Sequence, residues 1–146
     1  MWLHFLTVLV AGSMLPMQAG INAGLARDWG HPLWAAAVSF GVGTLVLTAA
    51  AGLLRLALPA WQQIADIPAW SWSGGLLGAF YVTVMVIFAP KLGAATLLAL
   101  VVAGQMLAST LLDHFGLLGF PQHAISGPRV LGVLLLFSGV ILIRKF

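Results

Sequence analysis

The chain of 146 residues contains no cysteine, and only 6% of its residues are charged. Without cysteine it can form neither a disulfide framework nor a thiolate metal site. An ordinary soluble domain is about one quarter charged, so this chain cannot cover itself with a polar surface. Because 62% of the residues are hydrophobic, most of the protein is predicted to be surrounded by lipid.

Glutamate is also absent, and the three aspartates, Asp28, Asp66 and Asp113, lie at or beyond the ends of the apolar runs. Proton-coupled cation exporters usually carry a carboxylate inside the membrane, and Asp113 is the only candidate for that role. No nucleophile and base, no paired carboxylates and no histidines at metal-ligand spacing are found. We therefore expect no enzyme, no metal and no cofactor. The net charge of +3 forms no basic stripe, which argues against a nucleic-acid partner.

Long uncharged runs divide the chain. Four of them lie between His4 and Arg27, His31 and Arg55, Asp66 and Lys91, and Lys91 and Asp113. Each is long enough to cross a hydrocarbon core of about 30 Å. The fifth run, 130–143, is shorter, but Arg129 and Arg144 can snorkel at its ends, so we predict a span that starts near Ser126. A re-entrant segment is the alternative.

Tryptophan supports this division, because all six tryptophans lie at or near the ends of the runs, where an indole ring is favoured between headgroups and acyl chains. The N-terminus lacks the basic cluster of a secretory signal, so the first run is expected to remain as a helix. The connections leave no room for a soluble domain. The predicted fold is an all-α integral membrane protein in which residues 1–146 form a single domain, a bundle of five transmembrane helices.

An odd number of spans places the two termini on opposite sides of the membrane. Four basic residues, Arg27, Lys91, Arg144 and Lys145, then lie on one side, and Arg55 and Arg129 lie on the other. The positive-inside rule therefore favours a cytoplasmic C-terminus. This difference leaves open that the chain inserts in both orientations, or that a partner chain decides the orientation.

Small residues are expected at the contacts between helices, because lipid provides no hydrophobic force for helix association. A spacing of four residues returns to the same face of a helix. The predicted packing glycines are Gly20, Gly24, Gly74, Gly78 and Gly104.

Polar side chains at membrane depth are the most informative feature. Gln18 and Asn22 lie four apart after Pro16, a residue that tends to bend a spanning helix. Gln105 and Ser109 are also four apart, one turn before Asp113. The side chains that could meet these residues from the other helices are Ser39, Thr44, Tyr81 and Thr83.

An amide that faces acyl chains loses its hydrogen bonds, at a cost of about 1–3 kcal/mol, so these amides should face protein or water. Two interpretations are open: the amides tie helices together, or they line a polar cavity. The residues predicted to line a substrate pathway are Gln18, Asn22, Ser39, Tyr81, Gln105 and Ser109.

Three further residues carry charge near the helix ends: Asp113, Arg129 and Lys91. Asp113 is predicted to form an ion pair with Arg129 on the same side of the membrane, and its alternative role is in coupling. Lys91 follows Pro90 at the turn into the fourth span. It is expected to anchor the chain in the interface, and the alternative is anion binding near a helix N-terminus.

Several strings in the sequence form a pattern of their own. They are Gln-Ala-Gly-Ile-Asn-Ala-Gly-Leu-Ala (18–26), Ser-Phe-Gly-Val-Gly (39–43), Gly-Gly-Leu-Leu-Gly-Ala-Phe-Tyr-Val (74–82), Ala-Pro-Lys-Leu-Gly-Ala-Ala-Thr (89–96), Ala-Gly-Gln-Met (103–106), Leu-Asp-His-Phe-Gly (112–116), Gly-Pro-Arg-Val-Leu-Gly-Val (127–133) and Ser-Gly-Val-Ile-Leu-Ile (138–143). With these strings the chain resembles, over essentially its whole length, the YdcZ-like branch of the drug/metabolite transporter superfamily.

The resemblance implies a bacterial inner-membrane protein equal to one half of an inverted-repeat ten-helix transporter. In that superfamily two five-helix units of opposite orientation surround a central pathway, either fused or as separate chains. The absence here of the intramembrane glutamate of the small multidrug members argues against proton-coupled export of cationic drugs.

The resulting hypothesis is a half-size secondary transporter for a small neutral or zwitterionic metabolite or drug. It would work by alternating access as an antiparallel dimer, with a second copy or with a paralogous five-helix chain, among membrane lipids. The alternative is a non-transporting assembly or lipid-binding subunit whose amides only tie helices together. A channel is disfavoured because too few polar stripes are present to line a wet pore.

Overall fold

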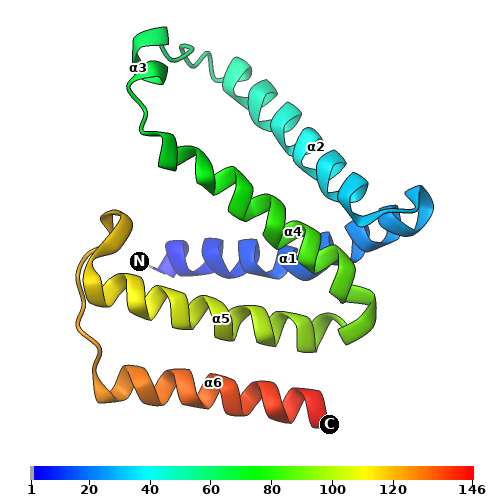
Figure 1. Cartoon of the computed structure of the whole chain (residues 1–146), viewed down its shortest axis with the longest axis vertical. Coiled ribbons are helices and arrows are strands. Elements are labelled where there is room, and N and C mark those ends of the chain that lie inside the picture. The colour runs from blue at the N-terminus through cyan, green and yellow to red at the C-terminus, as the bar shows by residue number, and fades with distance from the viewer. Residues whose placement is uncertain (1) are drawn as a thin grey trace. The chain divides into compact units, whose positions relative to one another are not determined.

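In the computed structural model, which describes residues 2–146, the chain is helical and the described residues form no strand. Five long helices follow one another (Figure 1): α1 (Trp2–Trp29), α2 (Pro32–Leu53), α4 (Ser73–Leu92), α5 (Ala94–Phe115) and α6 (Gly127–Lys145). Three short helices lie in the connections: α3 (Trp61–Ala65), η1 (Ala69–Trp72) and η2 (Leu117–Gly119). All five long segments are apolar and long enough to cross a membrane, which confirms the predicted all-α membrane fold.

The five helices divide into two compact units, Met1–Pro90 and Lys91–Phe146. The first unit contains α1, α2 and α4, and the second contains α5 and α6. Each unit is described by itself below. The expectation that all five helices form one domain stays a prediction.

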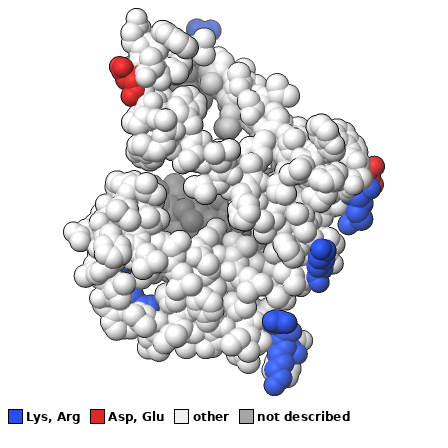
Figure 2. Space-filling view, in the orientation of Figure 1, with Lys and Arg blue, Asp and Glu red and all other residues white. Residues whose placement is uncertain are grey.

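The charged side chains lie near the ends of the helices. On the face shown in Figure 2, lysine, arginine and aspartate form separate small patches, and the surfaces between these patches carry no charge. Uncharged helix surfaces with charged ends are the pattern that a hydrocarbon layer between two aqueous interfaces selects.

Local sequence signals set the helix ends. His31 caps α2, because its Nδ1 atom accepts a hydrogen bond of 3.2 Å from the backbone N–H of Leu33, and Pro32 occupies the first turn. Gly116 ends α5 in the left-handed conformation, with φ of 61°. The fifth span starts after the cap residue Ser126, as predicted, and α6 is one continuous helix instead of a re-entrant segment.

Two connections contain helical residues. Between the third and fourth spans, α4 continues through Pro90 to Leu92, and Gly93 turns the chain, with φ of 75°. Between the second and third spans lies α3, a single turn whose cap residue Ala60 donates its backbone N–H to the side chain of Gln63.

Alanines make the contact between α1 and α2 in the first unit. Ala19 and Ala23 of α1 and Ala35 and Ala36 of α2 are at most 5% exposed, and the two helices pack directly against each other. Small side chains on facing positions allow two helix backbones to approach closely. The close packing expected of glycines is therefore provided here by alanines.

Of the predicted packing glycines, Gly78 is the one that lies against another helix. A Cβ atom added there would be 3.2 Å from Cζ of Phe40 on α2. Gly20, Gly74 and Gly104 face open space, and Gly24 meets only the side chain of Arg27 on its own helix. Within their own units these four glycines meet no other helix, and their role in helix packing stays a prediction.

In the second unit α5 and α6 lie side by side and antiparallel (Figure 1). Leu97 and Val140 are the larger buried side chains of this unit. The connection between the helices folds back on the end of α5, where the backbone N–H of His123 donates a 2.8 Å hydrogen bond to the carbonyl of Asp113. This connection places the first turn of α6 beside the last turn of α5.

Candidate functional site

The polar centre of the first unit consists of Gln18 and Asn22 on α1 and Ser39 on α2. The hydroxyl oxygen of Ser39 accepts two amide hydrogen bonds, from Nδ2 of Asn22 at 3.2 Å and from Nε2 of Gln18 at 3.5 Å. Asn22 is the one buried polar residue of the described chain, at 6% exposure. It lies between Ala19 and Ala23, so the alanine contact that joins α1 to α2 also brings Asn22 to Ser39.

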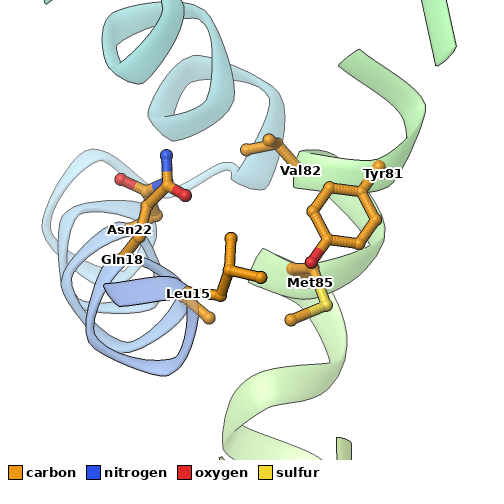
Figure 3. A pocket seen from close by; sticks show the side chains of 7 residues that line it. Leu15, Gln18, Asn22, Tyr81, Val82 and Met85 are labelled. Atoms are coloured by element: carbon orange, nitrogen blue, oxygen red, sulfur yellow. The ribbon is translucent and has the colours of Figure 1, made fainter. Parts of the chain in front are cut away.

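Tyr81 faces this centre from α4. Gln18, Asn22 and Tyr81 line a small pocket together with Leu15, Ala19, Val82 and Met85. In Figure 3 the Tyr81 ring projects from α4 toward α1, on the side where the two amides lie. The free space is about 10 Å³, which is close to the volume that one water molecule needs.

The hydroxyl of Tyr81 is buried and has no hydrogen-bond partner among residues 2–146. A buried hydroxyl without a partner is unfavourable by about 1–3 kcal/mol on protein mutational scales. The pocket beside it has about the volume of one water molecule, so the missing partner would be a single water or one small polar group of a solute.

A second cavity lies on the other side of the same amides. It is a groove of about 550 Å³ between α1 and α2, and Gln18, Asn22 and Ser39 line it. The rest of its wall is apolar and consists of Met14, Met17, Ile21, Leu25, Val38 and Val42. Gln18 and Asn22 therefore separate a narrow pocket next to Tyr81 from a wider groove.

The chemistry of this centre is neutral. Each amide offers an acceptor oxygen and two donor hydrogens, and a hydroxyl offers one donor and two acceptor positions. No described residue donates to the side-chain oxygens of Gln18 or Asn22. The site can thus donate hydrogen bonds to a solute and accept hydrogen bonds from it. It carries no charge that would select an ion.

Two candidates from the sequence do not join this centre. The hydroxyl of Thr44 donates to the backbone oxygen of Phe40 at 2.9 Å, and that of Thr83 donates to the backbone oxygen of Ala79 at 2.7 Å. Both bonds reach back four residues on the same helix, a common way for threonine to satisfy its hydroxyl in a spanning helix. The expected meeting with the amides of α1 is therefore absent.

Gln105 and Ser109 belong to the second unit, on α5. Gln105 is exposed and forms no hydrogen bond with another described residue. Ser109 donates to the backbone oxygen of Met106 at 3.2 Å. Their place in a substrate pathway stays a prediction.

Asp113 and Arg129 meet as expected from the sequence. Oδ2 of Asp113 lies 3.6 Å from Nη1 of Arg129, and both side chains are about one third exposed. Lys91 lies in the last turn of α4, shortly before α5 begins at Ala94, and its role as an interface anchor or in anion binding stays a prediction. Among the described residues no three histidines, cysteines or acidic residues lie close enough together to hold a metal ion.

The sequence interpretation missed the apolar walls of the two cavities, and in particular Leu15, Met85 and the alanines beside Asn22. The available signal was the spacing of Ala19 and Ala23, which returns to the face of Asn22. Met85 had no comparable signal, because one methionine in an apolar helix resembles any other lipid-facing residue.

Comparisons with known proteins agree with this architecture. A family model described as "Putative inner membrane exporter, YdcZ" matches residues 3–142. The protein "Inner membrane protein YdcZ" of Escherichia coli (strain K12) is 34% identical over 84 residues, which cover 58% of this chain and 56% of that relative. The chain thus matches about half the length of this relative. No solved structure matches the chain.

The family match covers most of the chain, and the five apolar helices provide the membrane segments that such a protein needs. Together they support a multi-pass protein of the bacterial inner membrane. The chain belongs to the YdcZ family of the drug/metabolite transporter superfamily.

Proposed function

We propose that the protein is a half-size secondary transporter that moves a small neutral or zwitterionic metabolite or drug across the inner membrane by alternating access. The observation that carries this proposal is the buried amide of Asn22. It is bonded to Ser39 and lies in the wall of a pocket that also holds the unpartnered hydroxyl of Tyr81.

Chemistry supports a neutral substrate. The amides of Gln18 and Asn22 and the hydroxyls of Ser39 and Tyr81 are uncharged, and the described spans contain no glutamate. A bound ion at membrane depth would need a charged partner, whereas a neutral or zwitterionic solute needs mainly hydrogen bonds. Gln105 and Ser109 would extend the pathway from α5.

The active form is proposed to be an antiparallel dimer, with a second copy or a paralogous chain. Alternating access around a site near the membrane midplane uses two halves of opposite orientation, and one five-helix chain supplies a single half. Gln105 supports this assembly. It lies in the middle of α5, exposed and without a hydrogen-bond partner among residues 2–146, and it needs another protein surface to avoid facing acyl chains.

Cysteine accessibility tests the pathway without knowledge of the substrate. The chain has no native cysteine, so Ser39→Cys introduces the single reactive thiol. We expect a membrane-impermeant thiol reagent to modify this thiol in vesicles, because water or solute must reach the site during transport. Leu47→Cys on the same helix, a position that is 72% exposed and lines neither of the two cavities, is the matched control and should react slowly.

Lack of reaction at Ser39→Cys from either side of the membrane would contradict the pathway.

A second experiment measures transport directly in proteoliposomes, with a panel of radiolabelled neutral and zwitterionic solutes. Asn22→Leu and Gln105→Leu should abolish transport while the protein stays folded and dimeric. Unchanged uptake by Gln105→Leu would remove that residue from the pathway.

Labelling of the C-terminus from each side of the membrane tests the assembly. Labelling from both sides is expected for a homodimer of opposed copies. Labelling from the cytoplasmic side alone would require a paralogous partner of opposite orientation, and cross-linking should then capture a chain of similar size.

The second candidate function is a non-transporting assembly or lipid-binding subunit. It is favoured by the hydrogen bonds from Gln18 and Asn22 to Ser39, because these bonds join two helices without needing a solute. Cross-linking in native membranes separates the two functions. A subunit of this kind would be captured mainly with a larger, unrelated protein.

A further inference from the structure

The second unit contains a cavity that shares one residue, Ser109, with the proposed transport pathway. It is a trough between α5 and α6, and it begins at a polar end of about 320 Å³ lined by Ser109, Thr110, Asp113 and Arg129. An apolar part of about 560 Å³ follows, between Leu98 and Val102 of α5 and Leu135 and Gly139 of α6. Gly132 and Leu136 line both parts, so the polar end and the apolar part form one continuous trough.

The ion pair at the polar end has unused hydrogen-bonding capacity. Nη1 of Arg129 contacts Oδ2 of Asp113 at 3.6 Å and donates to the carbonyl of His123 at 3.2 Å. The remaining guanidinium donors and Oδ1 of Asp113 contact no other described residue. Both side chains are about one third exposed. The pair therefore presents one positive and one negative group, side by side, to a ligand in the trough.

The connection between the two helices holds this pair in place. Gln122 donates to the carbonyl of His114 at 3.0 Å, and the backbone N–H of Ile125 donates to Nδ1 of His114 at 3.2 Å. With the bond from His123 to Asp113, these contacts fix the chain from α5 to α6 on the end of α5. The distance between the carboxylate and the guanidinium is thus set by the backbone and not by the side chains alone.

The depth of the two parts matches a membrane leaflet. Asp113 lies in the last turn of α5 and Arg129 in the first turn of α6, so the pair is at the level where lipid headgroups lie. From Arg129 to Gly139 the helix rises by about 15 Å, at about 1.5 Å per residue, and this equals half of a hydrocarbon core of about 30 Å. The apolar part of the trough therefore spans about one leaflet below the charged pair.

We propose that this trough binds a phospholipid whose headgroup carries both a phosphate and a primary ammonium, as in phosphatidylethanolamine. The phosphate accepts hydrogen bonds from the free guanidinium donors of Arg129. The ammonium donates to Oδ1 of Asp113 and to the hydroxyl oxygens of Ser109 and Thr110, whose protons are already used by the backbone oxygen of Met106. One acyl chain lies in the apolar part.

Charge complementarity selects this lipid over other membrane lipids. Phosphatidylglycerol has the phosphate but no cation for Asp113. Phosphatidylcholine has a quaternary ammonium, which has no N–H to donate to the carboxylate. The lipid with a primary ammonium satisfies both halves of the ion pair, and the site does not depend on whether the protein transports a solute.

Native mass spectrometry of the delipidated protein in detergent tests the proposal, with the three lipids added in separate titrations at equal acyl-chain length. We expect phosphatidylethanolamine to bind about threefold to tenfold more tightly than the other two, the range for one hydrogen bond to a partly exposed charge. Asp113→Asn should lower its affinity to that of phosphatidylcholine. Arg129→Gln should weaken binding of all three lipids.

Matched controls come from the first unit, where Asp66→Asn and Arg55→Gln remove the same charges outside the trough and should leave the order of affinities unchanged. Gly132→Leu tests the trough without changing the ion pair. A Cβ atom at Gly132 meets no atom within 4 Å, so the helix should fold while the leucine side chain fills the trough and lowers the affinity for all three lipids.

Equal affinity of the wild type for the three lipids would overturn the proposal. Unchanged lipid binding by Gly132→Leu would also overturn it, including in the case that Asp113→Asn fails to fold. In the Gly139→Cys variant, efficient disulfide formation between two protein chains that carry no bound lipid would show that a second chain covers the trough instead.

Discussion

The bond between Asn22 and Ser39 allows a quantitative test of how the first unit is held together. Asn22 is buried, and its Nδ2 atom lies 3.2 Å from the hydroxyl oxygen of Ser39. Gln18 reaches the same oxygen at 3.5 Å from an exposed position. Hydrogen bonds between N and O are strongest near 2.9–3.0 Å and weaken beyond 3.2 Å, so the two amides should contribute unequally.

Double-mutant cycles measure the two contributions separately. Coupling energies for hydrogen bonds between helices in membranes average about 0.6 kcal/mol and reach about 1.7 kcal/mol. For Asn22→Ala with Ser39→Ala we expect a coupling of about 0.6 kcal/mol in the free energy of unfolding. For Gln18→Ala with Ser39→Ala we expect less than about 0.3 kcal/mol, because the bond is long and exposed.

The assay is reversible unfolding in mixed micelles, followed by far-UV circular dichroism. Asn22→Ala with Thr44→Ala is the control cycle and should give no coupling, because the hydroxyl of Thr44 bonds to its own helix at the carbonyl of Phe40. A Gln18–Ser39 coupling as large as the Asn22–Ser39 coupling would refute the link between burial, distance and bond strength made here.

Three glycine substitutions test the backbone contacts. Gly75→Ala should stabilise the protein by about 0.5–1 kcal/mol through helix propensity alone, since its Cβ meets open space. Gly78→Ala should gain less or lose stability, because its Cβ would lie 3.2 Å from the ring of Phe40. Equal effects on the free energy of unfolding would refute the contact. Gly116→Ala should cost about 1–2 kcal/mol, because its φ of 61° is left-handed and its Cβ would lie 3.3 Å from Cβ of Gln122; an unchanged unfolding midpoint would contradict this.

The positions of the spans were predictable from charge alone. Few charges interrupt the apolar runs, and a charge inside the hydrocarbon layer is unfavourable, so the helices had to lie between the charged residues. The helix ends were less predictable, because hydrogen bonds of the backbone decide them. Gly93 and Gly116 turn the chain with positive φ, and neither turn can be inferred from hydropathy.

The polar site was predictable only in part. The spacing of Gln18 and Asn22 places both on one face of α1, and Ser39 was among their candidate partners, but no pattern distinguished it from Thr44. The difference lies in side-chain chemistry: a threonine in a helix readily donates to the carbonyl four residues earlier, and Thr44 does so. Spacing likewise places the predicted packing glycines on common faces without telling which neighbour each face meets; among them, Gly78 meets Phe40 of α2.

The geometry of Ser39 bears on the choice between a structural tie and a transport site. A tie that must hold two helices together would use short bonds, whereas Ser39 accepts its two amide bonds at 3.2 and 3.5 Å. Such bonds can be exchanged for bonds to a solute at little cost, because the replaced donors find new acceptors at once. If Ser39 acts in this way, a transported solute should slow the modification of Ser39→Cys, and the Asn22–Ser39 coupling should fall when that solute is bound. A structural tie would show full coupling under both conditions, since no solute would compete for the hydroxyl.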